Sequence, residues 1–298
     1  ILFRNPNLKI QFGHRTFAWE SEARGKAHVH VVIIGFGAAD APDKRIYDYE
    51  GKHVAVISAK NISPYLTEGS DLVLQNRTLP ISTVPEMKFG NMPNDDGNLL
   101  LSDEEKRQLL DQEPDARPLI RPLLSAHEYL RGEKRWCLWL RDVPPESFRD
   151  IKEVHRRIEA VRTYRSASKR EATKMLAKFP ALFGEIRQPT TRFVLVPCHS
   201  SETRRYIPLS YFSPEFIPNN SNLFLEGATL FHFGVLSSTM HMAWVRQICG
   251  RIKSDYRYSA SLVYNNYPWP ETATDKQRAA VEERAQAVLD ARKKYPDS

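Results

Sequence analysis

Phe12 to Phe36 read FGHRTFAWESEARGKAHVHVVIIGF, and this stretch decides how the fold begins. The spacing of apolar residues predicts strands at Gln11–Phe17 and Ala27–Phe36, separated by a polar stretch that favours a turn. At Val29–Val31 the alternation of apolar and polar residues changes to a continuous apolar run, as in a strand that enters a covered sheet. The chain therefore begins with a hairpin of two strands.

Strands and helices are mixed along the rest of the chain. Short strands are predicted at Val54–Ser58, Leu72–Leu74, Trp136–Leu140 and Phe193–Pro197. Ser102 and Glu105 form the pattern of a capping box, which begins a short helix. Longer helices are predicted at Glu146–Phe179, Val235–Ile252 and Ala273–Lys294. The expected fold class is α+β.

The composition is that of a soluble globular protein. Of the 298 residues, 41% are hydrophobic and 27% are charged. No apolar run has membrane-spanning length and no signal peptide pattern is present, so we expect a cytoplasmic protein with no membrane partner. Because the chain starts at Ile1, we expect it to be part of a longer protein. Three scattered cysteines suit neither a zinc site nor a disulfide framework and are expected to be reduced: Cys137, Cys198 and Cys249.

Positive charge is concentrated in one segment. The net charge is +7, and residues 151–210 contain thirteen Lys and Arg but five Asp and Glu. Such a segment suggests a polyanionic partner, although a solvated helix face would show the same surplus. The candidates for phosphate contacts here are Arg162, Arg165, Lys169 and Arg170 on the predicted helix, with Arg204 and Arg205 in a later loop.

Gly250–Ser259, with the sequence GRIKSDYRYS, contains the sharpest candidate for reading bases. A Lys can donate to the acceptor atoms of guanine, and an Asp can accept from the amino group of cytosine. Lys253 and Asp255 could thus read one G·C pair, while Arg251 and Arg257 would hold phosphates. The alternative is a solvated ion pair at a helix end.

The same stretch carries a family resemblance. Together with VYNNYPWP at Val263–Pro270, it resembles the end of the target recognition domain in MmeI-like type IIL restriction–modification proteins. Those proteins combine a nuclease, an adenine methyltransferase and a DNA-reading domain in one chain. Further stretches resemble the family in the same order: FGHRTFAWESEARGKAHVHVVIIGF, MKFGNMPNDDGNLLLSDEEK, GEKRWCLWL and SSETRRYIPLSYF. The resemblance covers essentially the whole chain.

The resemblance implies a domain order and a set of roles. It places the end of a methyltransferase sheet at residues 1–45, the target recognition domain at 46–262 and the start of a helical domain at 263–298. It implies that Lys253 and Asp255 read the outermost base pair, with guanine on the methylated strand. Loops that carry further base-reading residues would contact middle bases: His199, Ser200 and Ser201 in one, Asn219 and Asn220 in the other.

Catalytic motifs are not found in this stretch of sequence. Gly35-Phe36-Gly37 lacks the third glycine and the helix of a dinucleotide-binding motif. Asn266-Tyr267-Pro268-Trp269 lacks the paired prolines of an adenine methyltransferase box. We therefore expect this chain to bind double-stranded DNA and to catalyse nothing by itself, without a cofactor of its own. The rest of the parent protein would use S-adenosylmethionine for adenine-N6 methylation and Mg²⁺ for its nuclease.

Two other functions remain open from the sequence. A solitary nucleic-acid-binding regulator would carry the same basic segment, although no helix-turn-helix pattern is visible. A small-molecule enzyme would need a pocket, and Cys198-His199 is the place to look for it. The DNA-binding hypothesis predicts that the long helix, the Ser/Arg loop and the Lys253 segment converge on one concave basic face.

Overall fold

The computed structural model describes residues 7–20, 28–51 and 53–295, which form two compact units. The first comprises Ile1–Ile81, Ser201–Arg205 and Met242–Pro268. The second comprises Ser82–Ser200, Tyr206–His241 and Trp269–Ser298. Both mix strands and helices, so the predicted α+β class is confirmed.

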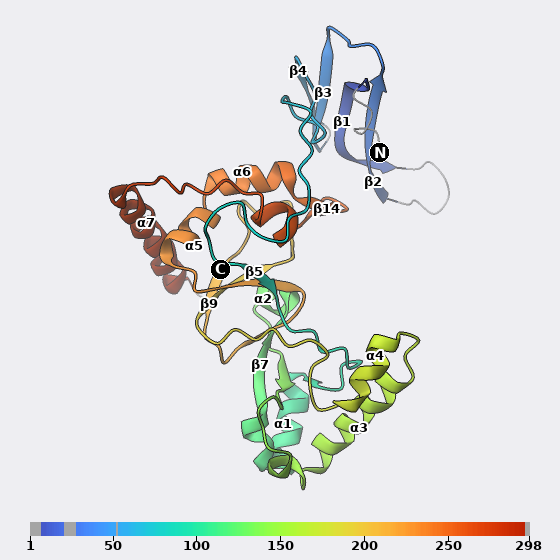
Figure 1. The fold of residues 1–298 in the computed structure, drawn as a ribbon, viewed down its shortest axis with the longest axis vertical. Coiled ribbons are helices and arrows are strands. Elements are labelled where there is room, and N and C mark those ends of the chain that lie inside the picture. Colours follow the sequence, from blue (N-terminus) through green and yellow to red (C-terminus); the bar gives the residue numbers. More distant parts are fainter. Residues whose placement is uncertain (1–6, 21–27, 52, 296–298) are drawn as a thin grey trace. The chain divides into compact units, whose positions relative to one another are not determined.

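A four-stranded mixed sheet opens the first unit (Figure 1). Its strands are β1 (Lys9–Glu20), β2 (His28–Gly37), β3 (Lys44–Glu50) and β4 (His53–Ala59), in the order β2-β1-β3-β4. β1 pairs antiparallel with β2 and parallel with β3, and β3 pairs antiparallel with β4. The pairing of the two hairpin strands and the strand at Val54–Ser58 are thus confirmed, whereas β3 was not predicted. The turn predicted between the hairpin strands, with Ala27, lies outside the described residues.

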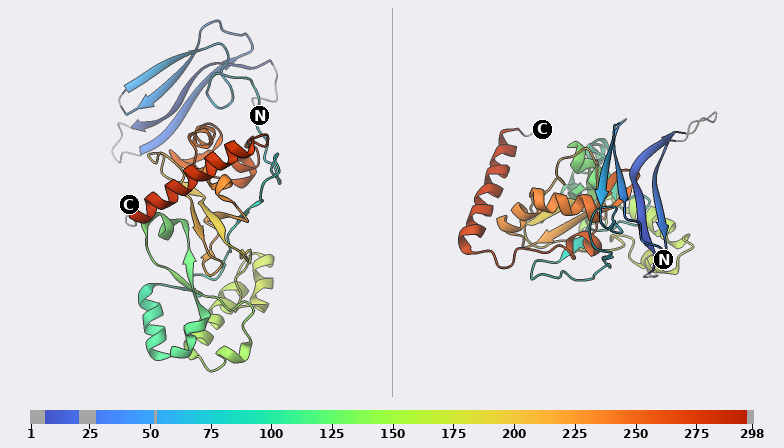
Figure 2. Two further views of the ribbon diagram at one scale, coloured as in Figure 1. Left: turned by 90° about the vertical axis from the view of Figure 1, so that its left-hand side faces the viewer. Right: turned by 90° about the horizontal axis from the view of Figure 1, so that it is seen from above.

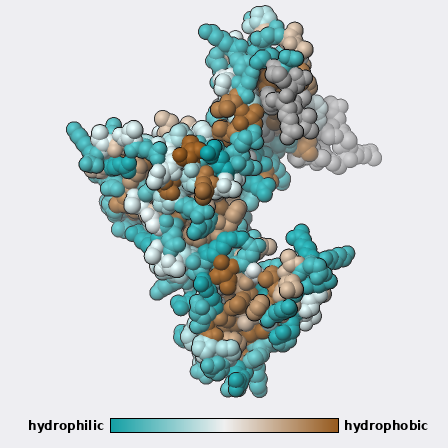
Figure 3. Space-filling view, in the orientation of Figure 1, coloured by the Kyte–Doolittle hydropathy of each residue, from teal (hydrophilic) through white to brown (hydrophobic). Residues whose placement is uncertain are grey.

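This sheet keeps apolar side chains at its surface. A small buried cluster forms its core: Ile10, Ile46, Ala59, Ile62 and Leu66. Exposed apolar residues on the same strands include Val29, Val32, Phe36 and Val56. Figure 3 shows apolar surface on the part of the chain that carries this sheet. Exposed apolar side chains gathered on one sheet often mark a contact with another domain or protein.

The remainder of the first unit contains most of a helix, a hairpin and a π-helical turn. They are α6 (Thr239–Ile248), the strands β14 (Gly250–Ile252) and β15 (Asp255–Arg257), and η5 (Ala260–Tyr264). The extended segment before Ser82 lies along η5, because the amides of Arg77 and Ile81 donate to the carbonyls of Ser261 and Asn265 at 2.9 Å each. The strand predicted at Leu72–Leu74 is wrong, since this segment does not join a sheet.

Two four-stranded sheets organise the second unit. One has the order β11-β9-β13-β5 and is antiparallel: β5 (Met87–Phe89), β9 (Phe193–Pro197), β11 (Ser210–Phe212) and β13 (Asn222–Glu226). The other has the order β12-β7-β8-β6: β6 (Leu100–Leu101), β7 (Ile120–Leu124), β8 (Trp136–Leu138) and β12 (Ile217–Pro218). The side chains of β9 are buried throughout, so its uninterrupted apolar sequence fits a central strand.

The helix predicted at Glu146–Phe179 is broken into pieces. They are η3 (Pro145–Phe148), α3 (Lys152–Ser166), α4 (Glu171–Met175) and η4 (Leu176–Lys178). The predicted apolar stripe is correct, because its members are buried in the core of the second unit: Phe148, Ile151, Val154, Ile158 and Val161. The chain turns after α3 because Arg165 binds carbonyl groups of the segment that follows, at Leu176, Phe179 and Leu182.

Further helical elements complete the second unit. α1 (Asp103–Gln112) begins at the predicted Ser102–Glu105 capping box, which is confirmed, and is followed by η2 (Pro114–Leu119) and α2 (Ala126–Arg131). The helix predicted at Ala273–Lys294 is confirmed as α7 (Asp275–Lys294). It packs on α5 (Leu230–Leu236) as Figure 2 shows, and Gly234 permits the close approach because a Cβ there would overlap Val281.

Candidate nucleic-acid interface

Lys253 and Asp255 lie at the tip of a tight hairpin, and not at the end of a helix as the sequence predicted. α6 ends at Ile248, and β14 and β15 pair so that Ile252 faces Asp255 across a two-residue turn. Both charged side chains are exposed. Lys253 has φ of 56°, a left-handed conformation that a non-glycine residue adopts only when its surroundings impose it.

Arg251 bridges this turn from the opposite strand. Its guanidinium donates to the carbonyl of Ser254 at 2.6 Å and to that of Arg246 at 3.4 Å. The same group lies 4.0 Å from the centre of the Tyr256 ring, its cross-strand partner. The hairpin was not predicted from the sequence, because Lys253-Ser254 is not one of the Asn-Gly or Asp-Gly pairs that signal a two-residue turn.

The Ser201–Arg205 loop is attached to the hairpin within the same unit. The backbone amide of Glu202 donates to Oδ1 of Asp255 at 3.2 Å. The guanidinium of Arg246 donates to the carbonyl of Arg205 at 3.3 Å. Arg204 and Arg205 are exposed, as is Arg257 on β15, so these predicted phosphate-binding side chains face solvent.

The other predicted base-reading positions differ in their exposure. His199 and Ser200 form the short strand β10 (His199–Ser200), in which His199 is exposed and Ser200 is only 3% exposed. Direct base reading by Ser200 is therefore wrong for this conformation, because its hydroxyl is buried. Ser201 is partly buried and its hydroxyl is hydrogen-bonded with that of Thr203 at 2.9 Å.

Asn219 and Asn220 occupy a hydrogen-bonded loop of the second unit. The Oδ1 of Asn219 accepts from the amide and the hydroxyl of Ser221, at 2.9 and 2.6 Å. The loop backbone lies against Gly90, where a Cβ would overlap the carbonyl oxygens of Asn219 and Pro218. Asn220 is exposed, so of this pair it is the side chain placed to contact a partner.

Arg165 is a structural residue, and its predicted phosphate contact is wrong. The side chain is fully buried and donates to five carbonyl oxygens, those of Pro93, Asn94, Leu176, Phe179 and Leu182. Burial lowers its pKa, but a guanidinium remains protonated at neutral pH. Its charge is satisfied inside the fold and cannot reach a phosphate.

The neighbouring candidates on α3 and α4 are exposed. Arg162 forms an ion pair with Glu159 at 3.1 Å, one helical turn away. Lys169 and Arg170 lie in the short connection between α3 and α4, and both side chains are exposed. These three residues keep the phosphate-binding prediction open.

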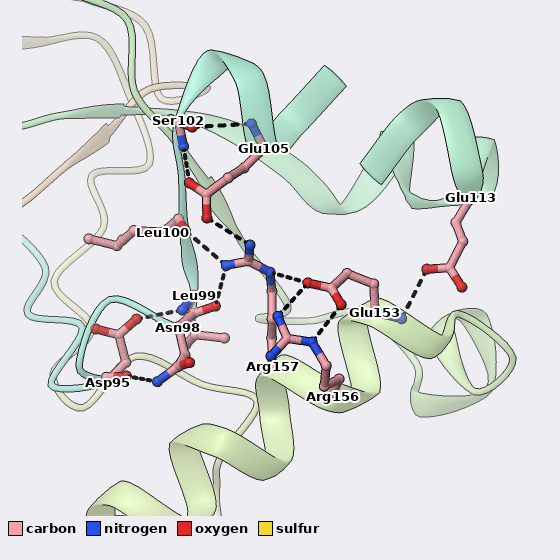
Figure 4. Close-up of polar contacts among 10 residues, drawn as sticks. All are labelled: Asp95, Asn98, Leu99, Leu100, Ser102, Glu105, Glu113, Glu153, Arg156 and Arg157. Carbon is pink, nitrogen blue, oxygen red and sulfur yellow. Dashed lines mark hydrogen bonds and ion pairs between the residues drawn. The ribbon is translucent and has the colours of Figure 1, made fainter. Parts of the chain in front are cut away.

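Part of the basic segment is neutralised internally, as the contacts of Arg157 illustrate (Figure 4). This buried guanidinium forms ion pairs with Glu105 and Glu153 at 2.9 Å each and donates to the carbonyls of Asn98 and Leu100. Burial opposes ionisation of Glu105, but hydrogen bonds from Ser102 and Arg157 outweigh it and lower its pKa to about 2. The sequence surplus therefore overstates the positive charge that is available to a polyanionic partner.

Other motifs considered from the sequence have structural explanations. Asn266 donates through Nδ2 to the carbonyls of Gln75, Ser261 and Leu262, so its amide holds the turn after η5. Gly35 faces the ring of Phe12 within the β1–β2 hairpin, where a Cβ would overlap that ring.

Metal and thiol chemistry would each require particular side chains among the described residues. In the described part of the chain, no cluster of three or more His, Cys, Asp and Glu is placed to hold a metal ion. Cys198 is buried whereas its neighbour His199 is exposed. Burial raises the pKa of the Cys249 thiol to about 12, which makes a thiolate unfavourable at neutral pH. No helix among the described residues is long and apolar enough to cross a membrane.

Comparison with known proteins shows the family to which this chain is related. Residues 68–271 match the family model described as the MmeI target recognition domain, and residues 1–48 match the MmeI DNA-methyltransferase domain. The chain belongs to the MmeI family. All residues of the candidate interface, from Arg162 to Arg257, lie in the part matched by the MmeI target recognition domain.

Two relatives support the MmeI assignment over nearly the whole chain. DNA methyltransferase A of Bacillus subtilis (strain 168) is 36% identical over 286 residues, which are 96% of this chain and 32% of that protein. A solved structure of the type IIL restriction–modification enzyme MmeI in complex with DNA is 44% identical, with a TM-score of 0.93, over 98% of this chain and 39% of that one. The chain thus spans less than two fifths of either relative.

Proposed function

We propose that this chain reads a specific sequence in double-stranded DNA as the recognition part of a restriction–modification adenine-N6 methyltransferase. The observation that carries the proposal is the exposed Lys253/Asp255 hairpin inside a region that matches the MmeI target recognition domain. The solved MmeI structure is a complex with DNA, which supports the same partner here. Recognition would direct methyl transfer by the rest of the protein in the cytoplasm.

The proposed roles follow the exposure of the side chains. Lys253 donates to O6 and N7 of guanine, and Asp255 accepts from the amino group of the paired cytosine. Asp255 retains Oδ2 for this contact because the Glu202 amide binds Oδ1. The exposed His199 and Asn220 contribute to reading middle base pairs, and the partly buried Ser201 and Asn219 support the two loops that carry them. The phosphate contacts come from exposed cations: Arg162, Lys169, Arg170, Arg204, Arg205 and Arg257.

Catalysis belongs to other parts of the parent protein in this proposal. S-adenosylmethionine would supply the methyl group and Mg²⁺ would serve the nuclease, both bound outside the residues described here. The match of residues 1–48 to the methyltransferase domain supports a contribution of β1, β2 and the start of β3 to that domain. The domain boundaries at 45 and 262 remain predictions.

Selection from a randomised pool of duplexes at two salt concentrations tests the proposal. We expect one short motif to be enriched, and six phosphate contacts to give a slope of roughly −5 when the logarithm of affinity is plotted against that of salt. A Lys169→Gln/Arg170→Gln variant should flatten this slope by about two without changing the motif. Arg156→Gln is the matched control, because both Nε and Nη2 of Arg156 are bound by Glu153, whereas Arg162 uses only Nε in its pair with Glu159. Binding that yields no motif would contradict sequence reading by this chain.

A further inference from the structure

Arg251 is held by contacts that do not suit a phosphate-binding residue. Its guanidinium donates to the carbonyls of Ser254 and Arg246 and lies over Tyr256, which is only 3% exposed. Arg251 is exposed, but these contacts fold its guanidinium back across the hairpin, whereas a side chain that contacts phosphate usually extends into solvent. Sequence alone predicted a phosphate contact at this position.

The bond to Ser254 closes the turn that presents Lys253. Ser254 is the second residue of that two-residue turn, and Lys253 is the first, with φ of 56°. A left-handed conformation at a lysine requires contacts elsewhere that hold it. The Arg251 fork supplies such a contact on one side of the turn, and the stacked Tyr256 ring fixes the plane of the fork.

The neighbouring loop restrains the other member of the base-reading pair. The Glu202 amide binds Oδ1 of Asp255, and Arg246 connects the loop to α6 through the Arg205 carbonyl. Since Arg251 binds the carbonyl of the same Arg246, the loop, the helix end and the turn form one hydrogen-bonded assembly. The backbone of the turn at Ser254 and the carboxylate of Asp255 are therefore both held before DNA binds.

We propose that Arg251 is a positioning residue that sets base specificity by locking the Lys253 turn, a role that rests on the proposed DNA recognition. Preorganised donors discriminate between bases better than mobile ones, because a mobile lysine can donate to several base edges. Without the Arg251 contacts, Lys253 should still reach DNA but should no longer discriminate guanine from other bases. The loss should be confined to the base pair that Lys253 and Asp255 read.

Two substitutions separate this role from a phosphate contact. Arg251→Lys keeps the charge but lacks the planar fork, and Arg251→Gln removes the charge as well. For a positioning role, both variants should lose about tenfold or more of the discrimination at one base pair, while the salt slope stays unchanged. Arg257→Gln on the facing strand is the matched control and should lower the salt slope by about one at unchanged discrimination.

The measurement is the affinity of the 298-residue chain and its variants for the selected duplex and for duplexes changed at each position. Thermal unfolding of each variant accompanies it, and the milder Arg251→Lys keeps the test available if Arg251→Gln does not fold. Full discrimination in both variants, with a lower salt slope in Arg251→Gln, would overturn the positioning role alone. A wild-type chain that selects no motif would overturn DNA recognition and this inference with it.

Discussion

Arginines of the basic segment at residues 151–210 have different roles, which their burial in the structure distinguishes. Arg162 and Arg165 lie one turn apart on α3, yet Arg162 is exposed and Arg165 is fully buried among carbonyl groups. The sequence shows the same residue type at both positions. The apolar stripe of α3 was predicted correctly. The partners of Arg165 include the carbonyls of Pro93 and Asn94, about 70 residues earlier in the sequence, and the apolar periodicity of α3 gives no information about that distant segment.

Arg157 provides a quantitative test at the same scale. Arg157→Met would remove the cation from Glu105 and Glu153 and leave the carbonyls of Asn98 and Leu100 without this donor. We expect a loss of about 2–3 kcal/mol in the free energy of unfolding, because both carboxylates retain some exposure to water. Chemical denaturation measures the change.

The adjacent Arg156 is the control for this prediction. It is exposed and forms a two-pronged contact with Glu153 alone. Arg156→Met should change the free energy of unfolding by less than about 1 kcal/mol. Equal effects of the two substitutions would contradict the structural role assigned to Arg157.

His241 gives the protein a predictable response to acid. Burial lowers the pKa of this side chain from 6.5 to about 3. The unfolded chain therefore binds a proton at a higher pH than the folded chain. The contribution of His241 to the free energy of unfolding is fully present above the ordinary pKa of 6.5 and is lost as the pH decreases toward 3. We expect a loss of about 1 kcal/mol from this group between pH 6.5 and about 5.5.

Denaturation at several pH values with His241→Gln beside the wild type tests that response. The variant should show a flatter dependence of stability on pH over this interval, whatever its absolute stability. Parallel profiles for the two proteins would show that His241 is not buried in its neutral form.

The Lys253 hairpin shows what sequence patterns miss at the level of elements. Residues 235–252 are apolar at helical spacing, which predicted one helix, but the chain turns at Ser237-Ser238 and α6 ends at Ile248. Gly250 then begins a strand whose turn lacks the usual residues. Elements with strong local signals were predicted well: α7, the capping box of α1 and the β1–β2 hairpin.

The conformation of the hairpin turn can be tested by substitution at Lys253. Glycine adopts a positive φ readily, whereas alanine does not, so Lys253→Gly should be about 1 kcal/mol more stable than Lys253→Ala. Thermal or chemical unfolding of the two variants measures the difference. Both should lose discrimination at the outermost base pair, because both lack the lysine donors. Equal stabilities would contradict the left-handed turn.

For the whole molecule, the functional prediction rested on charge distribution and family resemblance more than on any single motif. The basic segment at residues 151–210 suggested a polyanionic partner, and the ordered stretches of resemblance identified the MmeI family, which the comparisons confirm. Charge alone overstated the interface, since Arg157 and Arg165 are used inside the fold. The common basic face expected for the long helix, the Ser/Arg loop and the Lys253 segment remains a prediction.

The most direct test of the account exchanges the charges of the base-reading pair. The wild-type chain and a Lys253→Glu/Asp255→Arg variant are each used to select duplexes from a randomised pool. We expect one motif from each, identical except at a terminal base pair, where the wild type selects guanine on the methylated strand and the variant selects cytosine there. Identical motifs from the two proteins would contradict the claim that Lys253 and Asp255 read that base pair.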